Sequence, residues 1–242
     1  MEFTKTYSSP AAARQAHAHQ AWLAQLGMPV APVKARNGHF LVFAHVEGRH
    51  LGPAQLPEAA QLLGQAHAAA HHGYLSGVHL DEPCTVRDVG QLGPFTTPRI
   101  RRVQALLAAG AVPGPVLTAS EAARVVASAA DEPAAFYKDA NPRNFLHTPH
   151  GVIAVDFDDL TLAPFGYDLA KLIVTTAMTY GPLPPPLVRR TLDAYNAAVP
   201  HPVLPDRLTP WMEIHHILTS PYLGHNGYTH SWHTLRSNHQ PR

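Results

Sequence analysis

The pattern of apolar and polar positions predicts a small mixed segment at the start of the chain. Ser9 followed by Pro10 is typical of a helix start, and the alanine-rich run behind it stops at Gly27, so we expect a helix over residues 10–26. Residues 35–46 alternate around Asn37-Gly38, which predicts a β-hairpin. The pattern breaks from Gly48 onward, and we place a lobe boundary there.

The rest of the chain has mainly helical periodicity. Thr118 and Glu121 form a capping-box pattern that opens a helix ending near residue 130. Two short strands are expected at 145–147 and 152–155, and beyond Ser220 the chain is expected to be irregular. The other predicted helices are 58–72, 98–110, 167–180, 187–198 and 208–218. This order predicts an α+β chain with a small lobe at 1–48 and a larger, mainly helical lobe at 49–242.

One stretch of the larger part concentrates the candidate chemistry. Residues 136–159 read FYKDANPRNFLHTPHGVIAVDFDD, and the predicted hairpin returns Asp156 to the side of Asp139 and Asn144. Kinase-type phosphoryl transfer uses a carboxylate that accepts a proton, with an amide and a second carboxylate that hold Mg²⁺. Asp139 is therefore the candidate base, and Asn144 and Asp156 are candidate metal ligands. Asp158 is placed to reach a second ion.

Composition excludes several other classes of protein. Lys and Arg number 18 against 17 for Asp and Glu, so the net charge of +1 gives no footprint for nucleic acid or for an anionic membrane. The longest apolar runs, such as 172–178, are far shorter than the roughly 20 residues that span a bilayer. Cys84 is the only cysteine, and residues 1–27 show no charged-then-apolar leader, so we expect a cytoplasmic enzyme.

Histidine is unusually frequent, with 18 residues in the chain. Pairs at helical spacing are able to bind a metal, but no carboxylate or cysteine is placed to complete a ligand set near the C-terminus. Scattered surface or groove-lining imidazoles are therefore favoured over a metal site. The histidines concerned are His215, His216, His225, His230, His233 and His239.

Three linked motifs resemble those of the aminoglycoside phosphotransferase and choline kinase-like families, relatives of the protein kinases. The family's loop HGDxxxxN, its ID[FW][DE] hairpin end and its YDLA helix start correspond to 139–144 (DANPRN), 155–158 (VDFD) and 167–170 (YDLA). The resemblance implies a bilobal protein-kinase-like fold that uses Mg²⁺ and ATP or GTP to phosphorylate a small-molecule hydroxyl substrate. It also implies that Asp168 buttresses the catalytic loop.

The resemblance extends into the first lobe. The segment Phe3-Thr-Lys5-Thr-Tyr7 resembles the strand that carries the phosphate-binding lysine, so Lys5 is expected to contact the α and β phosphates. Phe43 is expected at the wall of the adenine pocket. His71 resembles a family histidine at the end of the first large-lobe helix, although it is equally suited to capping that helix. The expected backbone contacts to adenine come from Ala44, His45 and Val46.

The first lobe departs from the family pattern in two places. Only four residues precede Lys5, so we expect the glycine-rich hairpin to be absent and the lobe to be reduced. The acidic partner of the lysine falls near Ala16, which leaves Gln15 or His19 as a weak substitute.

A third departure lies in the catalytic loop itself. Tyr137 and Lys138 replace the histidine and glycine before Asp139. The new cation either lowers the pKa of Asp139 or brings positive charge to the nucleotide phosphates, and in an open site Arg143 is a second candidate for supplying that charge. Lys138 is accordingly a candidate nucleotide-binding residue.

These departures leave several alternatives open. A degenerate kinase-like binding or partner protein and a nucleotidyl transferase compete with an active kinase, and a homodimer or a partner chain is able to complete the small lobe. Retention of the base and both metal positions favours catalysis. Few acids lie on the helices after Tyr180, so an uncharged or aromatic hydroxyl compound, such as an antibiotic, nucleoside or sugar, fits better than a polycation.

Overall fold

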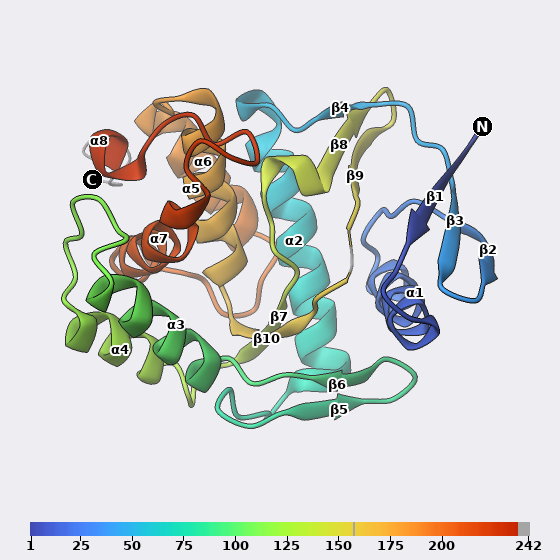
Figure 1. Ribbon diagram of the computed structural model, residues 1–242, viewed down its shortest axis with the longest axis horizontal. Helices are drawn as coiled ribbons and strands as arrows, with labels where there is room; N and C mark the ends of the chain where they lie inside the picture. Colours follow the sequence, from blue (N-terminus) through green and yellow to red (C-terminus); the bar gives the residue numbers. More distant parts are fainter. Residues whose placement is uncertain (157, 237–242) are drawn as a thin grey trace.

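A computed structural model describes residues 1–156 and 158–236 of the chain, and it has a small N-terminal lobe beside a larger helical one (Figure 1). The small lobe contains β1 (Glu2–Thr6), α1 (Pro10–Gln25), β2 (Val33–Asn37) and β3 (Phe40–Ala44). The three strands form an antiparallel sheet with β3 in the centre. The predicted helix start is confirmed, because the Ser9 side chain accepts a hydrogen bond from the Ala12 amide.

The larger lobe follows the predicted helix order. Its helices are α2 (Leu56–Ala70), α3 (Thr96–Ala108), α4 (Ala119–Ala127), α5 (Tyr167–Tyr180), α6 (Pro185–Asn196), α7 (Pro205–Thr219) and α8 (Trp232–Leu235). Shorter helical turns are η1 (Pro53–Gln55), η2 (His71–Leu75, a π-turn), η3 (Pro142–Asn144) and η4 (Ser220–Tyr222). The predicted capping box at Thr118 and Glu121 is present at the start of α4.

Short strands join these helices. The expected hairpin is formed by β8 (Phe145–Thr148) and β9 (Gly151–Ala154), and β4 (Arg49–His50) extends it to three strands. Two further antiparallel pairs were not predicted, β5 (Cys84–Val86) with β6 (Gly90–Leu92) and β7 (Ala134–Tyr137) with β10 (Thr161–Pro164). The strands of these pairs are three or four residues long, and β7 and β10 stand far apart in the sequence, so no local turn marks their pairing.

The prediction of irregular structure after Ser220 is wrong in part. Both η4 and α8 lie there, and Trp232 of α8 is buried, with its indole N–H donating to Glu213 of α7 at 2.9 Å. A four-residue helix gives no helical period in sequence, and its burial depends on α7.

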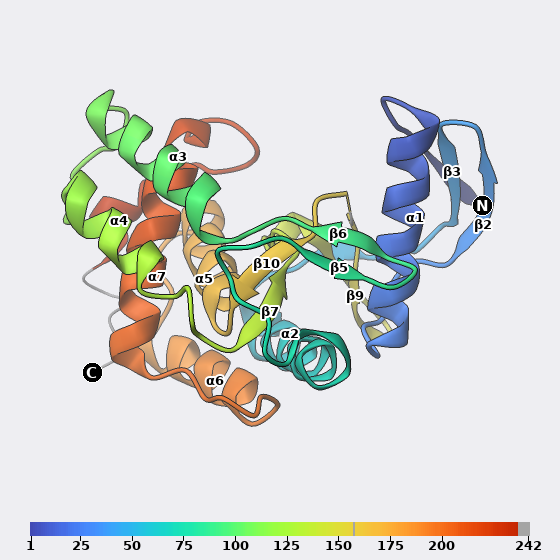
Figure 2. The ribbon, with the colours of Figure 1, turned by 90° about the horizontal axis from the view of Figure 1, so that it is seen from below.

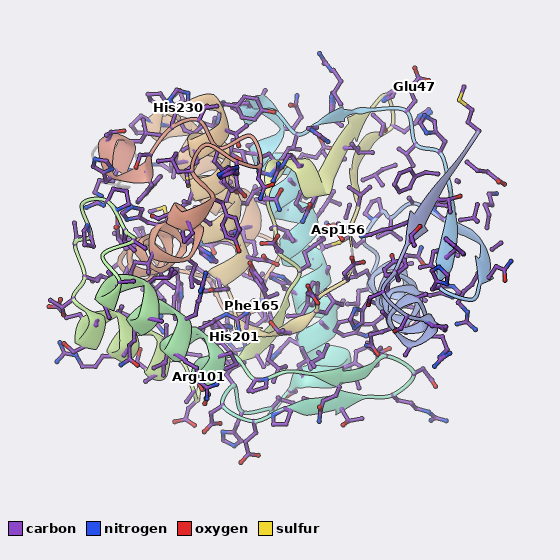
Figure 3. All side chains as sticks on the ribbon, in the orientation of Figure 1. Glu47, Arg101, Asp156, Phe165, His201 and His230 are labelled. Carbon is purple, nitrogen blue, oxygen red and sulfur yellow. The ribbon has the colours of Figure 1, made fainter. Side chains whose placement is uncertain are left out.

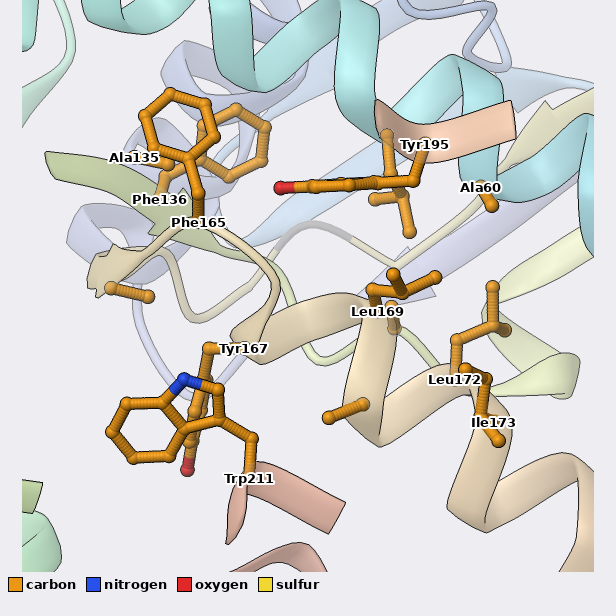
Figure 4. Packing of buried hydrophobic residues seen from close by; sticks show 14 of the residues in the cluster. Ala60, Ala135, Phe136, Phe165, Tyr167, Leu169, Leu172, Ile173, Tyr195 and Trp211 are labelled. Atoms are coloured by element: carbon orange, nitrogen blue, oxygen red, sulfur yellow. The ribbon is translucent and has the colours of Figure 1, made fainter. Parts of the chain in front are cut away.

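The core of the larger lobe lies around α5, which is buried along most of its length. Figure 4 shows the aromatic side chains on either side of it, with Phe136, Phe165 and Tyr195 in one group and Tyr167 against Trp211 in another. The Tyr167 and Trp211 rings meet edge to face with centroids 5.4 Å apart, a favourable aromatic geometry. This packing fixes α5, and α5 carries two of the site residues described below.

Two further findings concern the described residues. Within residues 1–156 and 158–236, no helix is long and apolar enough to cross a bilayer. The same residues hold no cluster of three or more His, Cys, Asp or Glu side chains suited to a metal ion. His215 and His216 are buried in α7, and the predicted His239, like Phe157, lies outside the described part of the chain.

Candidate functional site

The candidate base, Asp139, lies two residues after the end of β7 and has a left-handed backbone conformation, with φ of +61°. Aspartate tolerates this region better than most residues, but the conformation must be held. Asp168 in the first turn of α5 holds it, because its two carboxylate oxygens accept hydrogen bonds from the Lys138 and Ala140 amides, both at 2.8 Å. The β7–β10 pair and α5 thus place Asp168 as the expected buttress of the loop.

Three polar side chains orient the carboxylate of Asp139. Its Oδ1 accepts a hydrogen bond from the Tyr137 hydroxyl at 2.7 Å and lies 3.2 Å from the Lys171 ammonium. Its Oδ2 accepts a hydrogen bond from the side-chain amide of Asn141 at 3.1 Å. Burial acts to raise the pKa of Asp139, but the Lys171 charge and these hydrogen bonds outweigh it and hold the pKa below its usual range. The group is therefore a fixed, ionised carboxylate at neutral pH.

Asp168 itself is fully buried, next to His67 of α2. Burial raises the pKa of Asp168 to about 6, although the two amide donors favour its ionised form. Burial also lowers the pKa of His67 to about 3, so its ring is neutral, and its Nδ1 lies 2.8 Å from the Tyr195 hydroxyl. His67 therefore belongs to the uncharged packing behind the loop.

Sequence reasoning singled out His71 at the end of α2 and missed the buried His67. His71 lies in the π-turn after α2, where its Nδ1 is 2.9 Å from the Ala134 carbonyl oxygen. The available signal was the helical face, because His67 shares it with the buried Leu63, Ala66 and Ala70.

A cavity of about 470 Å³ lies between the two lobes, where Figure 3 labels Asp156. Asn144 and Asp156 line its larger-lobe side, and Lys5 lines it from the small lobe. Its remaining surface is mainly apolar, as expected for a pocket that holds a flat aromatic group. The other lining residues are Phe3, Tyr7, Ala31, Phe43, Ala44, His45, Val46, His50, Arg143, Leu146 and Val155.

Ala44, His45 and Val46, the residues expected to contact adenine, line this cavity, and two of their backbone amides are already hydrogen-bonded. The Ala44 amide donates to the Pro32 carbonyl at 2.8 Å, and the His45 amide donates to the Met1 carbonyl at 3.3 Å. A base in the cavity would therefore find these two donors already used. Among residues 44–46, the backbone groups still expected to contact adenine are the Val46 amide and the carbonyl oxygens.

Lys5 forms ion pairs that connect the two lobes. Its ammonium lies 2.9 Å from Asp156 Oδ1 and 2.7 Å from Asp158 Oδ2. Burial acts to lower the pKa of Lys5, but the hydrogen bonds and charges of Asp158 and Asp156 raise it overall. The lysine thus finds its acidic partners in two carboxylates that the sequence analysis predicts as metal ligands.

The donor set around this ion pair fits a hard divalent cation. Asp156 and Asp158 converge on one positive charge, and the Oδ1 atom of Asp158 is buried without a hydrogen-bond partner among the described residues. The Asn144 side-chain N–H donates to the Asp139 carbonyl at 2.9 Å, which leaves the amide oxygen to face other groups. Two carboxylates and an amide oxygen are ligands that Mg²⁺ accepts.

Lys138 takes one of the two roles considered for it, that of lowering the pKa of Asp139, and Gln15 has partners other than Lys5. The Lys138 side chain is buried, with its ammonium 3.3 Å from the Val155 carbonyl oxygen and 4.6 Å from the centre of the Phe145 ring, so it does not line the cavity. It acts only as one of the charges that lower the pKa of Asp139. Gln15 lies against His19 and donates to the Val89 carbonyl in the β5–β6 turn, away from Lys5.

A second cavity, of about 400 Å³, adjoins the other side of the catalytic loop. Asp139 and Asn141 line it from the loop, and Lys171 lines it from α5. Arg143 lines both cavities, so the loop is their common wall. The other lining residues are Arg102, Tyr137, Leu218, Tyr222, Asn226 and Tyr228. The candidate base faces one cavity, and the candidate metal ligands Asn144 and Asp156 face the other.

Comparison with known proteins identifies the family of the chain. A model of the phosphotransferase enzyme family matches residues 3–211. None of the curated protein sequences matches the chain.

Several solved structures share the fold at low sequence identity. The aminoglycoside phosphotransferase APH(3'')-Id from Streptomyces rimosus, solved with ADP and streptomycin, is 16% identical, with a TM-score of 0.55 over 89% of this chain and 85% of that one. Amicoumacin kinase hAmiN, in complex with AMP-PNP and Ca²⁺, is 15% identical, with a TM-score of 0.61 over 91% and 72%. The Plasmodium vivax ethanolamine kinase is 11% identical, with a TM-score of 0.58 over 96% and 74%.

Proposed function

Because the chain belongs to the phosphotransferase enzyme family and has a kinase-like fold, we propose that it transfers the γ-phosphoryl group of a Mg²⁺-bound nucleoside triphosphate to a hydroxyl group of a small metabolite or natural product. ATP and GTP are the candidate donors. The observation that carries the proposal is the division of one loop between two cavities, with Asp139 on one side and Asn144 with Asp156 on the other.

The residues have distinct roles in this proposal. The nucleotide lies in the larger cavity, with its base beside Phe43 and the Val46 backbone and its phosphates near Lys5. Asn144, Asp156 and Asp158 hold Mg²⁺, which neutralises negative charge on the phosphates when it is bound. The complexes of APH(3'')-Id with ADP and of hAmiN with AMP-PNP and Ca²⁺ support a nucleotide and a divalent metal here.

Asp139 acts on the acceptor. Its fixed carboxylate accepts a hydrogen bond from the acceptor hydroxyl and orients the oxygen toward the phosphorus atom. A base with a lowered pKa is weak, which suits a loose transition state in which the hydroxyl proton leaves late. Tyr137, Asn141 and Lys171 keep the carboxylate in this orientation.

Replacement of the base tests the proposal. Asp139→Asn retains the size of the side chain but removes its charge, so we expect turnover to fall by about a thousandfold while metal-nucleotide affinity changes little. Calorimetry with Mg²⁺ and ATP or GTP measures the binding, and mass spectrometry of the product measures the transfer. Wild-type turnover in the variant would refute the assignment. Addition of a nucleotidyl group in place of phosphate would identify the alternative chemistry.

A further inference from the structure

The charges that line the smaller cavity are unbalanced toward positive. Three cationic side chains line it, Arg102, Arg143 and Lys171, against the single carboxylate of Asp139. They come from three separate elements, because Arg102 lies on α3, Arg143 on η3 and Lys171 on α5. Glu213 of α7 pairs with His216 and Arg236 and is not part of this lining.

The lysine is already neutralised, and the arginines are not. Lys171 lies 3.2 Å from Asp139. Among the salt bridges of residues 1–156 and 158–236, none includes Arg102 or Arg143. The Arg143 guanidinium lies 5.5 Å from the centre of the Tyr228 ring, and it also lines the nucleotide cavity. Arg102 lines the smaller cavity alone, so nucleotide binding does not account for it.

We propose that the acceptor hydroxyl compound carries an anionic group, a carboxylate or a phosphate, which Arg102 and Arg143 bind in the smaller cavity. This inference rests on the proposed function, because the cavity faces the candidate base. Arginine pairs with both kinds of anion through two parallel hydrogen bonds. A polycationic acceptor would instead meet like charges and lose affinity. The tyrosines at 137, 222 and 228 offer a half-apolar surface for the body of the compound.

Two matched series of probes test the proposal on the wild-type protein loaded with Mg²⁺ and a non-hydrolysable ATP analogue. The first is mandelate, mandelamide and 2-amino-1-phenylethanol, and the second is glucose 6-phosphate, glucose and glucosamine. Calorimetry should show that the anion of at least one series binds at least about tenfold more tightly than its neutral and cationic analogues. The series that responds distinguishes a carboxylate from a phosphate.

Two neighbouring arginines provide a matched pair of variants. Arg102→Gln should weaken binding of the preferred anion by about tenfold, the cost typical of one charge-assisted contact. Arg102→Glu should make the cationic amine bind more tightly than the anion. Arg101→Gln removes an exposed cation one residue away on the same helix, outside the cavity lining, and should leave binding unchanged (Figure 3).

The outcomes separate failure of the anionic acceptor from failure of the proposed function. Equal or tighter binding of the neutral or cationic probes in both series, no anion binding at millimolar concentration, or equal losses in the 101 and 102 variants would overturn the inference. Binding of the Mg²⁺-nucleotide complex is measured first in the same protein. Its absence would count against the proposed function, whereas nucleotide binding with a preference for amines would overturn only the anionic acceptor.

Discussion

The ionisation state of Asp139 depends on one residue outside the catalytic loop. Lys171 of α5 lies on its Oδ1 side and is itself almost buried, whereas 44% of the Asp139 side chain is exposed, so water reaches the pair mainly from the aspartate. The Lys171 charge is the largest influence that lowers the pKa of Asp139 against the effect of burial. Lys171 is therefore a positioning residue that keeps the base charged in a partly dry site.

Removal of the Lys171 charge should move the pH dependence of the reaction. In Lys171→Met the pKa of Asp139 rises, so we expect the acidic limb of the kcat/KM profile to shift upward by about one pH unit. Lys171→Arg keeps the charge and serves as the control. Nucleotide hydrolysis, with water as the acceptor, provides the assay. Identical acidic limbs for the methionine and arginine variants would show that the ion pair does not set the ionisation of the base.

The buried carboxylate of Asp168 should make stability depend on pH. Burial raises its pKa from 3.8 to about 6, so folding favours the protonated form. Its contribution to the free energy of unfolding is fully present below pH 3.8 and is lost as the pH rises through about 6. Relative to Asp168→Asn, wild type should gain roughly 1 kcal/mol between about pH 7.5 and about pH 5. Urea denaturation at both pH values measures this, and a gap that narrows on acidification would contradict it.

Sequence reasoning reached the site residues that belong to motifs and missed those that depend on packing. Asp139, Asn144 and Asp156 stand at fixed spacings on a loop and a hairpin, so their convergence follows from local structure. Lys171 and His67 approach the loop only because α5 and α2 are held in the core. The sequence positions of Lys171 and His67 do not show that these residues lie close to the loop.

At the scale of elements, the crossing of α2 and α6 supports the catalytic loop from behind. Tyr195 of α6 lies 2.8 Å from His67 of α2, and its hydroxyl accepts a hydrogen bond from the Gly166 amide at 3.0 Å, just before α5. The two helices approach closely at Gly64, where an added Cβ would lie 2.8 Å from the Tyr195 carbonyl oxygen. The position of Tyr195, and hence the start of α5, depends on that glycine.

Replacement of Gly64 by alanine should destabilise the protein, although alanine is usually more stabilising than glycine within a helix. Alanine is the better helix former by about 1 kcal/mol, but overpacking against α6 costs about 1–3 kcal/mol. We expect Gly64→Ala to lower the free energy of unfolding by about 1 kcal/mol. Gly73→Ala in η2, where a Cβ would have no neighbour within 4 Å, should be neutral or stabilising. Urea denaturation compares the two, and a stabilised Gly64→Ala would show that the helices separate without cost.

The long helices were predictable from sequence, and strands that pair across a long stretch of chain were not. Helices α1, α2 and α5 span 16, 15 and 14 residues, enough for several periods of a buried stripe. The strands β7 and β10 have four residues each and owe their conformation to one another, about 25 positions apart. The β-hairpin of the small lobe was predicted because its turn is local, although the turn residues are Gly38 and His39 and Asn37 ends the strand.

At the scale of the whole molecule, two contacts bridge the lobes on different sides. Lys5 of β1 reaches Asp156 and Asp158, and the β5–β6 hairpin extends from the larger lobe toward α1, where Gln15 donates to the Val89 carbonyl at 2.8 Å (Figure 2). The first bridge uses the same carboxylates that are proposed to hold the metal. The lysine ammonium and a divalent cation therefore compete for one pair of carboxylates.

Because of this competition, removal of the lysine charge should change the affinities for metal and for nucleotide in opposite directions. In Lys5→Met the two carboxylates lose their cation, so we expect affinity for Mn²⁺ without nucleotide to rise by about three- to tenfold, because the partly exposed ion pair is a modest competitor. Affinity for the Mg²⁺-nucleotide complex should fall by a similar factor, since a phosphate contact is removed. Calorimetry measures both quantities, with Lys34→Met, which removes an exposed lysine of β2, as the control. If metal affinity falls together with nucleotide affinity, Lys5 assists the metal site, and the bridge between the lobes is part of the metal-bound state.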